Sequence, residues 1–143
     1  MNRRGRAGRG RWLLPPLLWW LVTAAGAATV SWTATPAAVR VAGPDRDYHS
    51  ATLTAPAPAA GLVPAQVSWA YRVRGGPPPR AWLCQGGHCL RLHGARGRAP
   101  APPRWRADAP LRFRFRLADG ATPVRVEQLR LTVTGARAGQ SGE

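Results

Sequence analysis

The sequence of 143 residues predicts one small all-β domain, expected to be a β-sandwich, with a partly open β-barrel as the alternative. Three observations support this class. Several short runs alternate apolar and polar side chains, Gly- and Pro-rich turns separate those runs, and after residue 27 no stretch keeps a helical period over three turns. We expect the domain to span residues 28–135, followed by a flexible tail over residues 136–143.

Residues 1–27 predict a secretory signal peptide. A basic start with five arginines and no acid precedes a short apolar run over residues 12–22, and Ala25-Gly26-Ala27 forms a small-residue cleavage site. The apolar run is shorter than the roughly 20 residues that a membrane helix needs, and Pro15-Pro16 interrupts it. We therefore expect export to the periplasm, cleavage after Ala27 and no stable membrane span afterwards. An uncleaved anchor is the alternative.

The first part of the domain predicts three short strands. Val30, Trp32 and Ala34 alternate with polar residues, which predicts a strand over residues 30–34. A second short strand is expected at residues 39–41. A third is expected within residues 47–54, where Tyr48 and Leu53 are candidate core residues. Residues 55–61 are rich in proline, which cannot donate to a strand ladder, so they predict a loop.

The middle of the chain predicts a strand followed by a hairpin. From Val67 to Arg74, large apolar residues occupy every second position, which is typical of a strand with one buried face. A Gly-Pro break at residues 75–79 follows. Two short apolar runs, residues 80–84 and 89–92, then surround a Gly-Gly turn at residues 85–88, and this pattern predicts a β-hairpin.

The two cysteines would face each other across this hairpin. An exported protein can oxidise Cys84 and Cys89, and the pairing is then unique. A disulfide closing so small a loop would stabilise the fold by roughly 2 kcal/mol. Two alternatives remain open. One is a metal site formed by both cysteines with His88 and His93, and the other is a redox pair, although the usual redox spacing is C-x-x-C.

The last part of the chain contains the clearest strand. Leu111, Phe113, Phe115 and Leu117 alternate with arginines over residues 111–117. Asp119-Gly120 predicts a turn, and the final strand begins at Val124. Its apolar positions change parity near Glu127-Gln128, which predicts a β-bulge.

Residues 93–110 are expected to be irregular. Trp105, within this Pro-rich stretch, is either a lid on the sheet or an exposed contact residue. The expected core combines large residues from all the predicted strands. They are Trp69, Tyr71, Trp82, Leu83, Leu90, Phe113, Phe115, Leu129 and Leu131.

The charge of the chain is strongly basic. It has 21 basic residues, all arginine, against 6 acidic ones. We interpret this excess mainly as a compositional bias, and the alternative is a surface that binds polyanions. The arginines are spread singly along the predicted strands, so we do not expect a nucleic-acid partner.

Enzyme chemistry finds little support in the sequence. Ser68 has no G-x-S-x-G setting, and no phosphate-binding loop precedes a helix. We therefore expect a non-enzymatic protein without cofactor or metal.

Four short motifs in order resemble the flagellar protein FlhE family. They are Ser68-Trp69-Ala70-Tyr71-Arg72-Val73, Gly76-Pro77, Leu83-Cys84 with Cys89, and Ala109-Pro110-Leu111-Arg112-Phe113. The resemblance covers about residues 67–133 and extends to the signal peptide and the length. It implies a small periplasmic β protein of the flagellar export apparatus, with Cys84 and Cys89 as a disulfide and with no catalytic residues.

The resemblance also implies partners and two modes of action. The expected partners are flagellar export or structural proteins, and self-association is left open. The protein would limit proton leak through the flagellar export gate or act like a chaperone on flagellar components. The candidate partner-binding face is formed by Arg112, Arg114 and Arg116 with Trp105, unless these arginines are simply the solvated side of a strand. The alternative function is a secreted, basic polyanion-binding β module that uses the same residues, with steep salt dependence.

Overall fold

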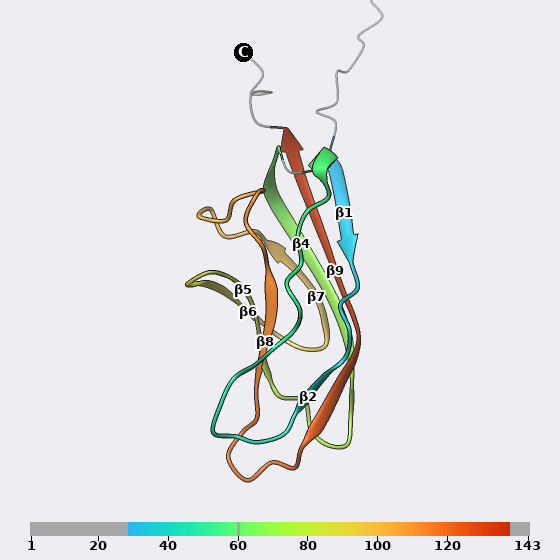
Figure 1. Cartoon of the computed structure of the whole chain (residues 1–143), viewed down its shortest axis with the longest axis vertical. Coiled ribbons are helices and arrows are strands. Elements are labelled where there is room, and N and C mark those ends of the chain that lie inside the picture. The colour runs from blue at the N-terminus through green and yellow to red at the C-terminus, as the bar shows by residue number, and fades with distance from the viewer. Residues whose placement is uncertain (1–28, 60, 138–143) are drawn as a thin grey trace, which may run out of the picture.

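The computed structural model describes residues 29–59 and 61–137, which form two antiparallel β-sheets that are not closed into a barrel (Figure 1). The β-sandwich prediction is confirmed over its barrel alternative. In chain order the elements are β1 (Val30–Ala34), β2 (Val39–Val41), β3 (Tyr48–His49), the short 3-10 helix η1 (Ala57–Ala59), β4 (Leu62–Arg74), β5 (Arg80–Gln85), β6 (His88–Leu92), β7 (Arg96–Pro100), β8 (Arg112–Arg116) and β9 (Val124–Arg137).

The five-stranded sheet is built around β9, the longest strand. Its order is β1-β9-β4-β7, and β2 pairs with the first part of β9. β1 pairs with the last part of the same strand, so the segment 30–41 runs along one side of β9. β4 lies on the other side of β9 and carries β7 on its outer edge. The predicted bounds of β1 and β2 are confirmed.

A β-bulge lies in β9 where the sequence predicts it. The pairing with β4 shifts between Ala70 and Arg72, opposite Gln128. Gln128 adopts a left-handed backbone conformation with φ 53°, the conformation that the first residue of one type of bulge takes, where it is usually glycine. Because of this extra residue, Val126 and Leu129 both point into the core although they are three positions apart.

β7 is a strand that the sequence analysis did not predict, since residues 93–110 were expected to be irregular. Its inward residues are small. Gly97 lies against the indole of Trp69, and a Cβ atom at Gly97 would overlap that ring. The same indole donates a hydrogen bond from Nε1 to the carbonyl oxygen of Gly94 at 3.1 Å. The ring of Trp69 fills the space that large side chains of β7 would otherwise occupy, so the apolar alternation that identifies a strand is missing.

β4 also begins earlier than predicted, at Leu62 instead of Val67. A second shift of pairing lies between Pro64 and Gln66. Proline is tolerated in a strand at such an irregularity because the ladder is already interrupted there. The proline and the shift together hide the period of two in this part of the sequence.

The four-stranded sheet has the order β3-β8-β5-β6. β5 and β6 form the predicted hairpin, in which Gln85 pairs with His88 across Gly86 and Gly87. Gly86 has φ 56°, a conformation that tight hairpin turns favour and that glycine adopts without strain. β3 is shorter than the expected strand over residues 47–54.

The core lies between the two sheets. Seven of the predicted core residues are buried, namely Trp69, Tyr71, Leu83, Phe113, Phe115, Leu129 and Leu131. Leu90 is partly buried and packs against them, but Trp82 does not belong to the core. The ring of Tyr71 on β4 meets the ring of Phe115 on β8 edge-on, with centroids 5.6 Å apart. This contact joins the two sheets.

Burial also changes the acidity of the Tyr71 hydroxyl. Removal from water raises the pKa of Tyr71 above its usual value of about 10, and the positive charge of Arg91 lowers it by a smaller amount. The hydroxyl donates a hydrogen bond to the carbonyl oxygen of Gly94 at 3.3 Å.

The ends of the chain bear on three predictions. β9 continues to Arg137, which pairs with Leu62, so Ala136 and Arg137 belong to the sheet and not to the predicted tail. The predicted signal peptide, residues 1–27, and the rest of the predicted tail, residues 138–143, lie outside the described residues. Within residues 29–59 and 61–137, no helix has the length and apolar character needed to cross a membrane.

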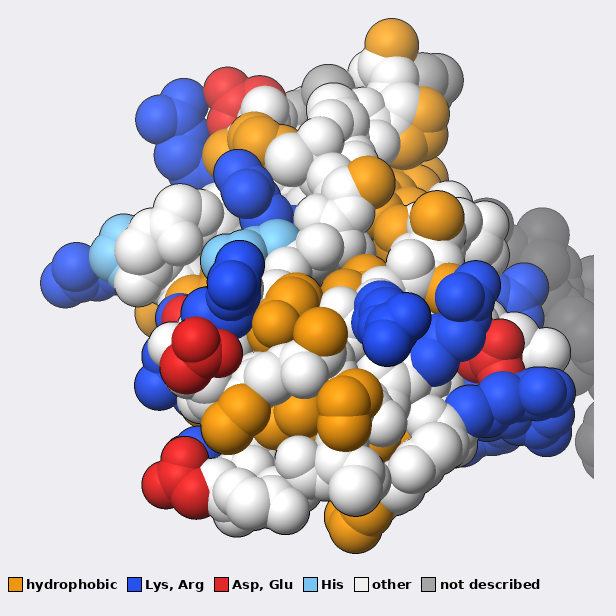
Figure 2. All heavy atoms as spheres, turned by 60° about the horizontal axis from the view of Figure 1, so that its bottom comes forward, with side chains coloured by type: hydrophobic (Ala, Val, Ile, Leu, Met, Phe, Trp, Pro, Cys, Tyr) orange, Lys and Arg blue, Asp and Glu red, His pale blue; other side chains and the backbone are white. Residues whose placement is uncertain are grey.

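Loops close the lower end of the sandwich, at residues 42–47, 75–79 and 117–123. Figure 2 shows this end, with hydrophobic side chains gathered in the middle and arginines on both flanks. The loops expose Pro44, Pro77 and Pro123 among other small residues. The arginines on the two flanks come from the outer surfaces of the two sheets.

Candidate partner-binding face

The outer surface of the four-stranded sheet carries the three arginines singled out by the sequence. Arg112, Arg114 and Arg116 alternate along β8 with Phe113 and Phe115, whose side chains are fully buried. The alternation of core and arginine is confirmed, and the arginines point outward. We define the four-stranded face as the outward residues of this sheet, which are His49, Arg80, Trp82, Cys84, Cys89, Arg91, Arg112, Arg114 and Arg116.

Trp82 lies at the centre of the four-stranded face, flanked by two guanidinium groups. Its neighbours in the sheet are Arg114 on β8 and Arg91 on β6. The guanidinium carbons lie 4.4 Å and 4.7 Å from the ring centroid, within the range of cation–π attraction. The expectation that Trp82 belongs to the core is wrong. Ala81 and Leu83 are the inward residues of β5, so the tryptophan between them must point outward.

The three arginines of β8 differ in their partners. Arg116 Nε donates to Asp47 Oδ1 at 2.8 Å, which neutralises part of its charge. Arg114 is held over Trp82, and its buried Nε atom has no hydrogen-bond partner among the described residues. Arg112 is exposed. Arg112 and Arg114 are therefore the cations of β8 that remain available to an incoming anion.

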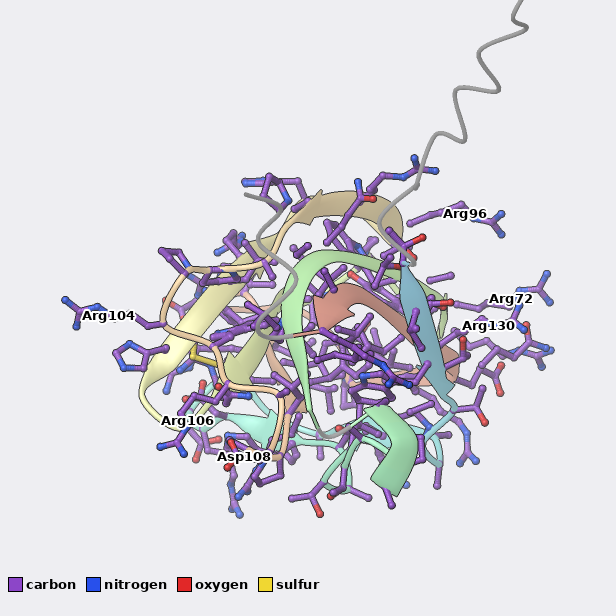
Figure 3. All side chains as sticks on the ribbon, turned by 90° about the horizontal axis from the view of Figure 1, so that it is seen from above. Arg72, Arg96, Arg104, Arg106, Asp108 and Arg130 are labelled. Carbon is purple, nitrogen blue, oxygen red and sulfur yellow. A yellow bond between two sulfur atoms is a disulfide. The ribbon has the colours of Figure 1, made fainter. Side chains whose placement is uncertain are left out.

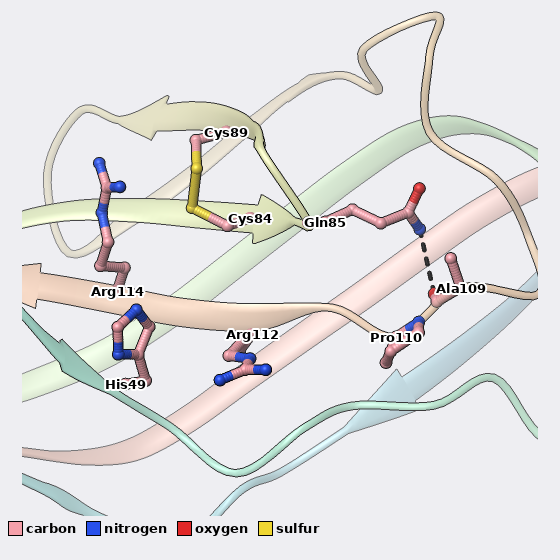
Figure 4. Close-up of a pocket in the computed structure, with 9 residues that line it drawn as sticks. His49, Cys84, Gln85, Cys89, Ala109, Pro110, Arg112 and Arg114 are labelled. Carbon is pink, nitrogen blue, oxygen red and sulfur yellow. Dashed lines mark hydrogen bonds between the residues drawn. A yellow bond between two sulfur atoms is a disulfide. The ribbon is translucent and has the colours of Figure 1, made fainter.

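A depression of about 380 Å³ lies beside these two arginines (Figure 4). His49 and the arginines line one side, and the Cys84–Cys89 disulfide lies across from them. Pro110, next to Ala109, closes one end. One wall thus offers hydrogen-bond donors and the other offers sulfur and apolar carbon, a combination that suits a carboxylate-bearing side chain.

Gln85 fixes the loop that forms this end of the depression. Its Nε2 donates to the carbonyl oxygens of Arg106 and Ala109 at 2.7 Å and 3.0 Å, and the amide of Arg106 donates to its Oε1 at 2.6 Å. These bonds satisfy a buried amide that would otherwise be costly. The sequence pattern predicts Gln85 only as a turn residue. The one signal available was its position directly after the apolar run of β5.

Trp105 belongs to the same loop and is 4% exposed. Its Nε1 donates to the carbonyl oxygen of His88 at 3.1 Å, so the ring packs under the hairpin as a lid. The lid alternative is confirmed. The placement of Trp105 in the partner-binding face is wrong, because the ring does not reach the surface. A polyanion-binding site built from the arginines of β8 with Trp105 therefore lacks its aromatic residue.

Cys84 and Cys89 form the predicted disulfide, with their Cα atoms 4.1 Å apart on neighbouring strands. The bond engages both sulfur atoms that a metal site with His88 and His93 would need. Within residues 29–59 and 61–137, no group of three or more His, Cys, Asp or Glu side chains is placed to hold a metal ion. The disulfide lies on the outer side of the sheet and joins β5 to β6 next to the turn of the hairpin.

The fold and this face define a class of protein: a small β-sandwich, pinned by a hairpin disulfide, with a basic and aromatic surface on one sheet. The chain belongs to the FlhE family of flagellar proteins, because the sequence model of the flagellar protein FlhE matches residues 38–134. This segment begins just before β2 and ends within β9, so it contains the whole four-stranded face. The resemblance found in the sequence motifs is confirmed, and membership supports an accessory role in the flagellum.

A solved structure described as the crystal structure of FlhE has the same fold. It aligns with a TM-score of 0.64 at 24% sequence identity, covering 78% of this chain and 100% of the other. At this identity the likeness concerns the fold alone. A search of curated proteins finds no match.

Proposed function

We propose that this protein is a non-enzymatic, periplasmic accessory protein of flagellar assembly that binds an acidic surface of a flagellar protein through the four-stranded face. The observation that carries the proposal is the arrangement of Arg91, Trp82 and Arg114 within the segment that matches the FlhE family. Family membership supplies the flagellar context, and the arrangement supplies a means of binding.

The composition of the face is typical of the residues that dominate protein interfaces. Tryptophan and arginine are enriched among the side chains whose removal costs most binding energy. A guanidinium group can donate two parallel hydrogen bonds to one carboxylate. Because Trp82 already orients Arg91 and Arg114, less side-chain freedom is lost when a partner binds.

The predicted signal peptide supports the proposed location. Residues 1–27 have the order of a basic start, an apolar run and a small-residue site. The Cys84–Cys89 disulfide agrees with an oxidising compartment such as the periplasm.

Two modes of action fit this binding surface. In one, the protein limits proton leak through the flagellar export gate. In the other, it acts like a chaperone on flagellar components that have reached the periplasm. Both modes need an acidic partner surface, and they differ in whether loss of the protein changes the cytoplasmic pH or the placement of filaments.

The test is deletion of the gene in its own host, followed by complementation. Strains would carry the parent chain, an Arg112→Gln, Arg114→Gln, Arg116→Gln variant, or a control with the same loss of charge at three exposed, scattered positions, Arg40→Gln, Arg104→Gln and Arg137→Gln. Motility, filament location and cytoplasmic pH would be scored with flagellar synthesis on and off.

We expect the deletion to change pH or filament placement only when flagella are made. The parent and the control should restore the normal state, and the β8 variant should not. Normal complementation by a correctly oxidised β8 variant would show that the arginines of β8 are only a solvated surface. An unchanged phenotype on deletion would contradict the flagellar function itself.

A further inference from the structure

A second basic surface lies on the outer side of the five-stranded sheet, where no sequence motif marks it. Its exposed arginines come from three adjacent strands: Arg72 on β4, Arg96 and Arg98 on β7, and Arg130 on β9. Figure 3 shows Arg72, Arg96 and Arg130 extending from the same side of the molecule. We call this surface the five-stranded face.

These four arginines have no carboxylate partner among the described residues. Among the described residues, Glu127 is the acidic side chain of this face, and it forms ion pairs with Arg74 and Arg125. Like charges on neighbouring strands repel each other. An external anion would relieve that repulsion, so the face is suited to a partner that brings several negative charges.

Hydroxyl groups lie directly beside Arg130. Thr33, Ser68 and Thr132 line a shallow depression of about 280 Å³ together with this arginine. The hydroxyls of Thr33 and Thr132 are hydrogen-bonded to each other at 3.0 Å, which fixes their positions. A guanidinium group beside hydroxyl donors matches the oxygens of a phosphate ester.

The five-stranded face has no aromatic anchor. Among the described residues the one large apolar side chain classed as exposed is Val63, at 53%, near the start of β4 and away from the arginines. Protein interfaces normally centre on buried aromatic or apolar side chains. The four-stranded face has such a centre in Trp82, and the five-stranded face does not.

We propose that the five-stranded face docks on the surface of a membrane that contains anionic phospholipids. Three neighbouring strands hold the arginines on one side of a rigid sheet, so several guanidinium groups reach the phosphate layer together. Each basic residue near such a surface strengthens binding by about a factor of five. This inference goes beyond the proposed function, because it concerns a different surface and a different class of ligand.

The test is co-sedimentation of the exported protein with vesicles. One set contains phosphatidylglycerol and phosphatidylcholine, and the other contains phosphatidylcholine alone. Binding would be measured at about 0.1 M and about 0.5 M salt, since salt screens surface charges within about 10 Å or less at these concentrations. Two triple variants with equal loss of charge are compared. The five-stranded variant carries Arg72→Gln, Arg96→Gln and Arg130→Gln. The β8 variant carries Arg112→Gln, Arg114→Gln and Arg116→Gln. Parent and variants share one N-terminus, so the contribution of residues 1–28 cancels.

The five-stranded variant should lose binding to the anionic vesicles by roughly a hundredfold, and the β8 variant by less than about tenfold. Binding should fall steeply with salt and be absent with phosphatidylcholine alone. If both variants lose vesicle affinity by the same factor, the net charge of the protein alone explains the binding, and the proposal is overturned. Preference for soluble polyglutamate over the vesicles would also overturn it, because the face would then be a site for acidic protein.

Discussion

The two sheets of this domain present arginine in two different settings. On the four-stranded face, guanidinium groups of Arg91 and Arg114 lie over Trp82, and Arg116 is paired with Asp47. On the five-stranded face, Arg72 and Arg130 are exposed, and neither forms an ion pair with a carboxylate among the described residues. The same residue type is therefore held in place on one side and left extended on the other.

A basic composition therefore does not by itself define a binding site. Oriented arginines around an aromatic ring lose little freedom on binding and can select a particular carboxylate arrangement. Extended arginines without an apolar centre respond mainly to the total negative charge of a surface. Substitutions on one side of the sandwich should therefore leave the binding properties of the other side unchanged.

The largest expected effect comes from removing a tryptophan from each sheet. Trp69 is 5% exposed and supports β7. The substitution Trp69→Ala should therefore lower the free energy of unfolding by about 3–5 kcal/mol. Trp82→Ala should cost at most about 2 kcal/mol, since it removes cation–π contacts at a half-buried site. Chemical denaturation measures both changes.

The Trp82→Ala variant should nevertheless lose partner binding, whereas a folded Trp69 variant should keep it. If Trp69→Ala does not fold, Trp69→Phe keeps most of the ring and should cost about 1–2 kcal/mol through the lost bond to Gly94. A larger stability cost for Trp82→Ala than for Trp69→Ala would contradict the assignment of one tryptophan to the surface and the other to the core.

The disulfide should have an intermediate effect, confined to the four-stranded side. Changing both Cys84 and Cys89 to Ala should lower the free energy of unfolding by roughly 2 kcal/mol, because the bond closes a short loop in the unfolded chain. The parent protein, unfolded with and without a reducing agent, provides the matched comparison.

Vesicle binding through the five-stranded face should survive loss of the disulfide, while partner binding should weaken because the bond forms a wall of the depression beside Arg112. A variant that loses vesicle binding and partner binding together would show that the two faces are not separable.

The sequence predicted the features that depend on regular alternation. The strand with Arg112, Arg114 and Arg116, the two short N-terminal strands and the hairpin disulfide all have the expected places. The bulge at Gln128 was predictable because a change of parity leaves a trace in the pattern of apolar residues.

Features that depend on contacts between distant segments were not predictable. β7 carries small inward residues because Trp69 from another strand fills the space above Gly97. Trp82 lies in a continuous apolar run, so its outward direction follows only from its buried neighbours. Trp105 could be assigned to the lid only when its bond to His88 was known. The five-stranded face combines arginines from three strands, and their proximity depends on the pairing of β7 with β4.

The smallest expected effect is a loss of stability at alkaline pH, caused by Tyr71 at the contact between the two sheets. Burial raises the pKa of Tyr71 in the folded protein, so above pH 10 the unfolded chain ionises this hydroxyl more readily than the folded one. The contribution of the Tyr71 hydroxyl to the free energy of unfolding is fully present below about pH 10. As the pH rises further, this contribution falls by at most about 1.4 kcal/mol per pH unit.

Denaturation midpoints measured between about pH 8 and 11 test this effect. Tyr71→Phe should be less stable at neutral pH because it loses the hydrogen bond to Gly94, yet its stability should fall less above pH 10. Tyr48→Phe, on the four-stranded sheet, is the matched control and should keep the alkaline loss of the parent. Because Arg91 lowers the pKa of Tyr71, Arg91→Gln should extend the loss to higher pH. If stability falls with pH at the same slope in the Tyr71→Phe and Tyr48→Phe variants, the alkaline loss does not come from Tyr71. The charge of Arg91 would then act only on the surface of its own sheet and not on the core between the two sheets.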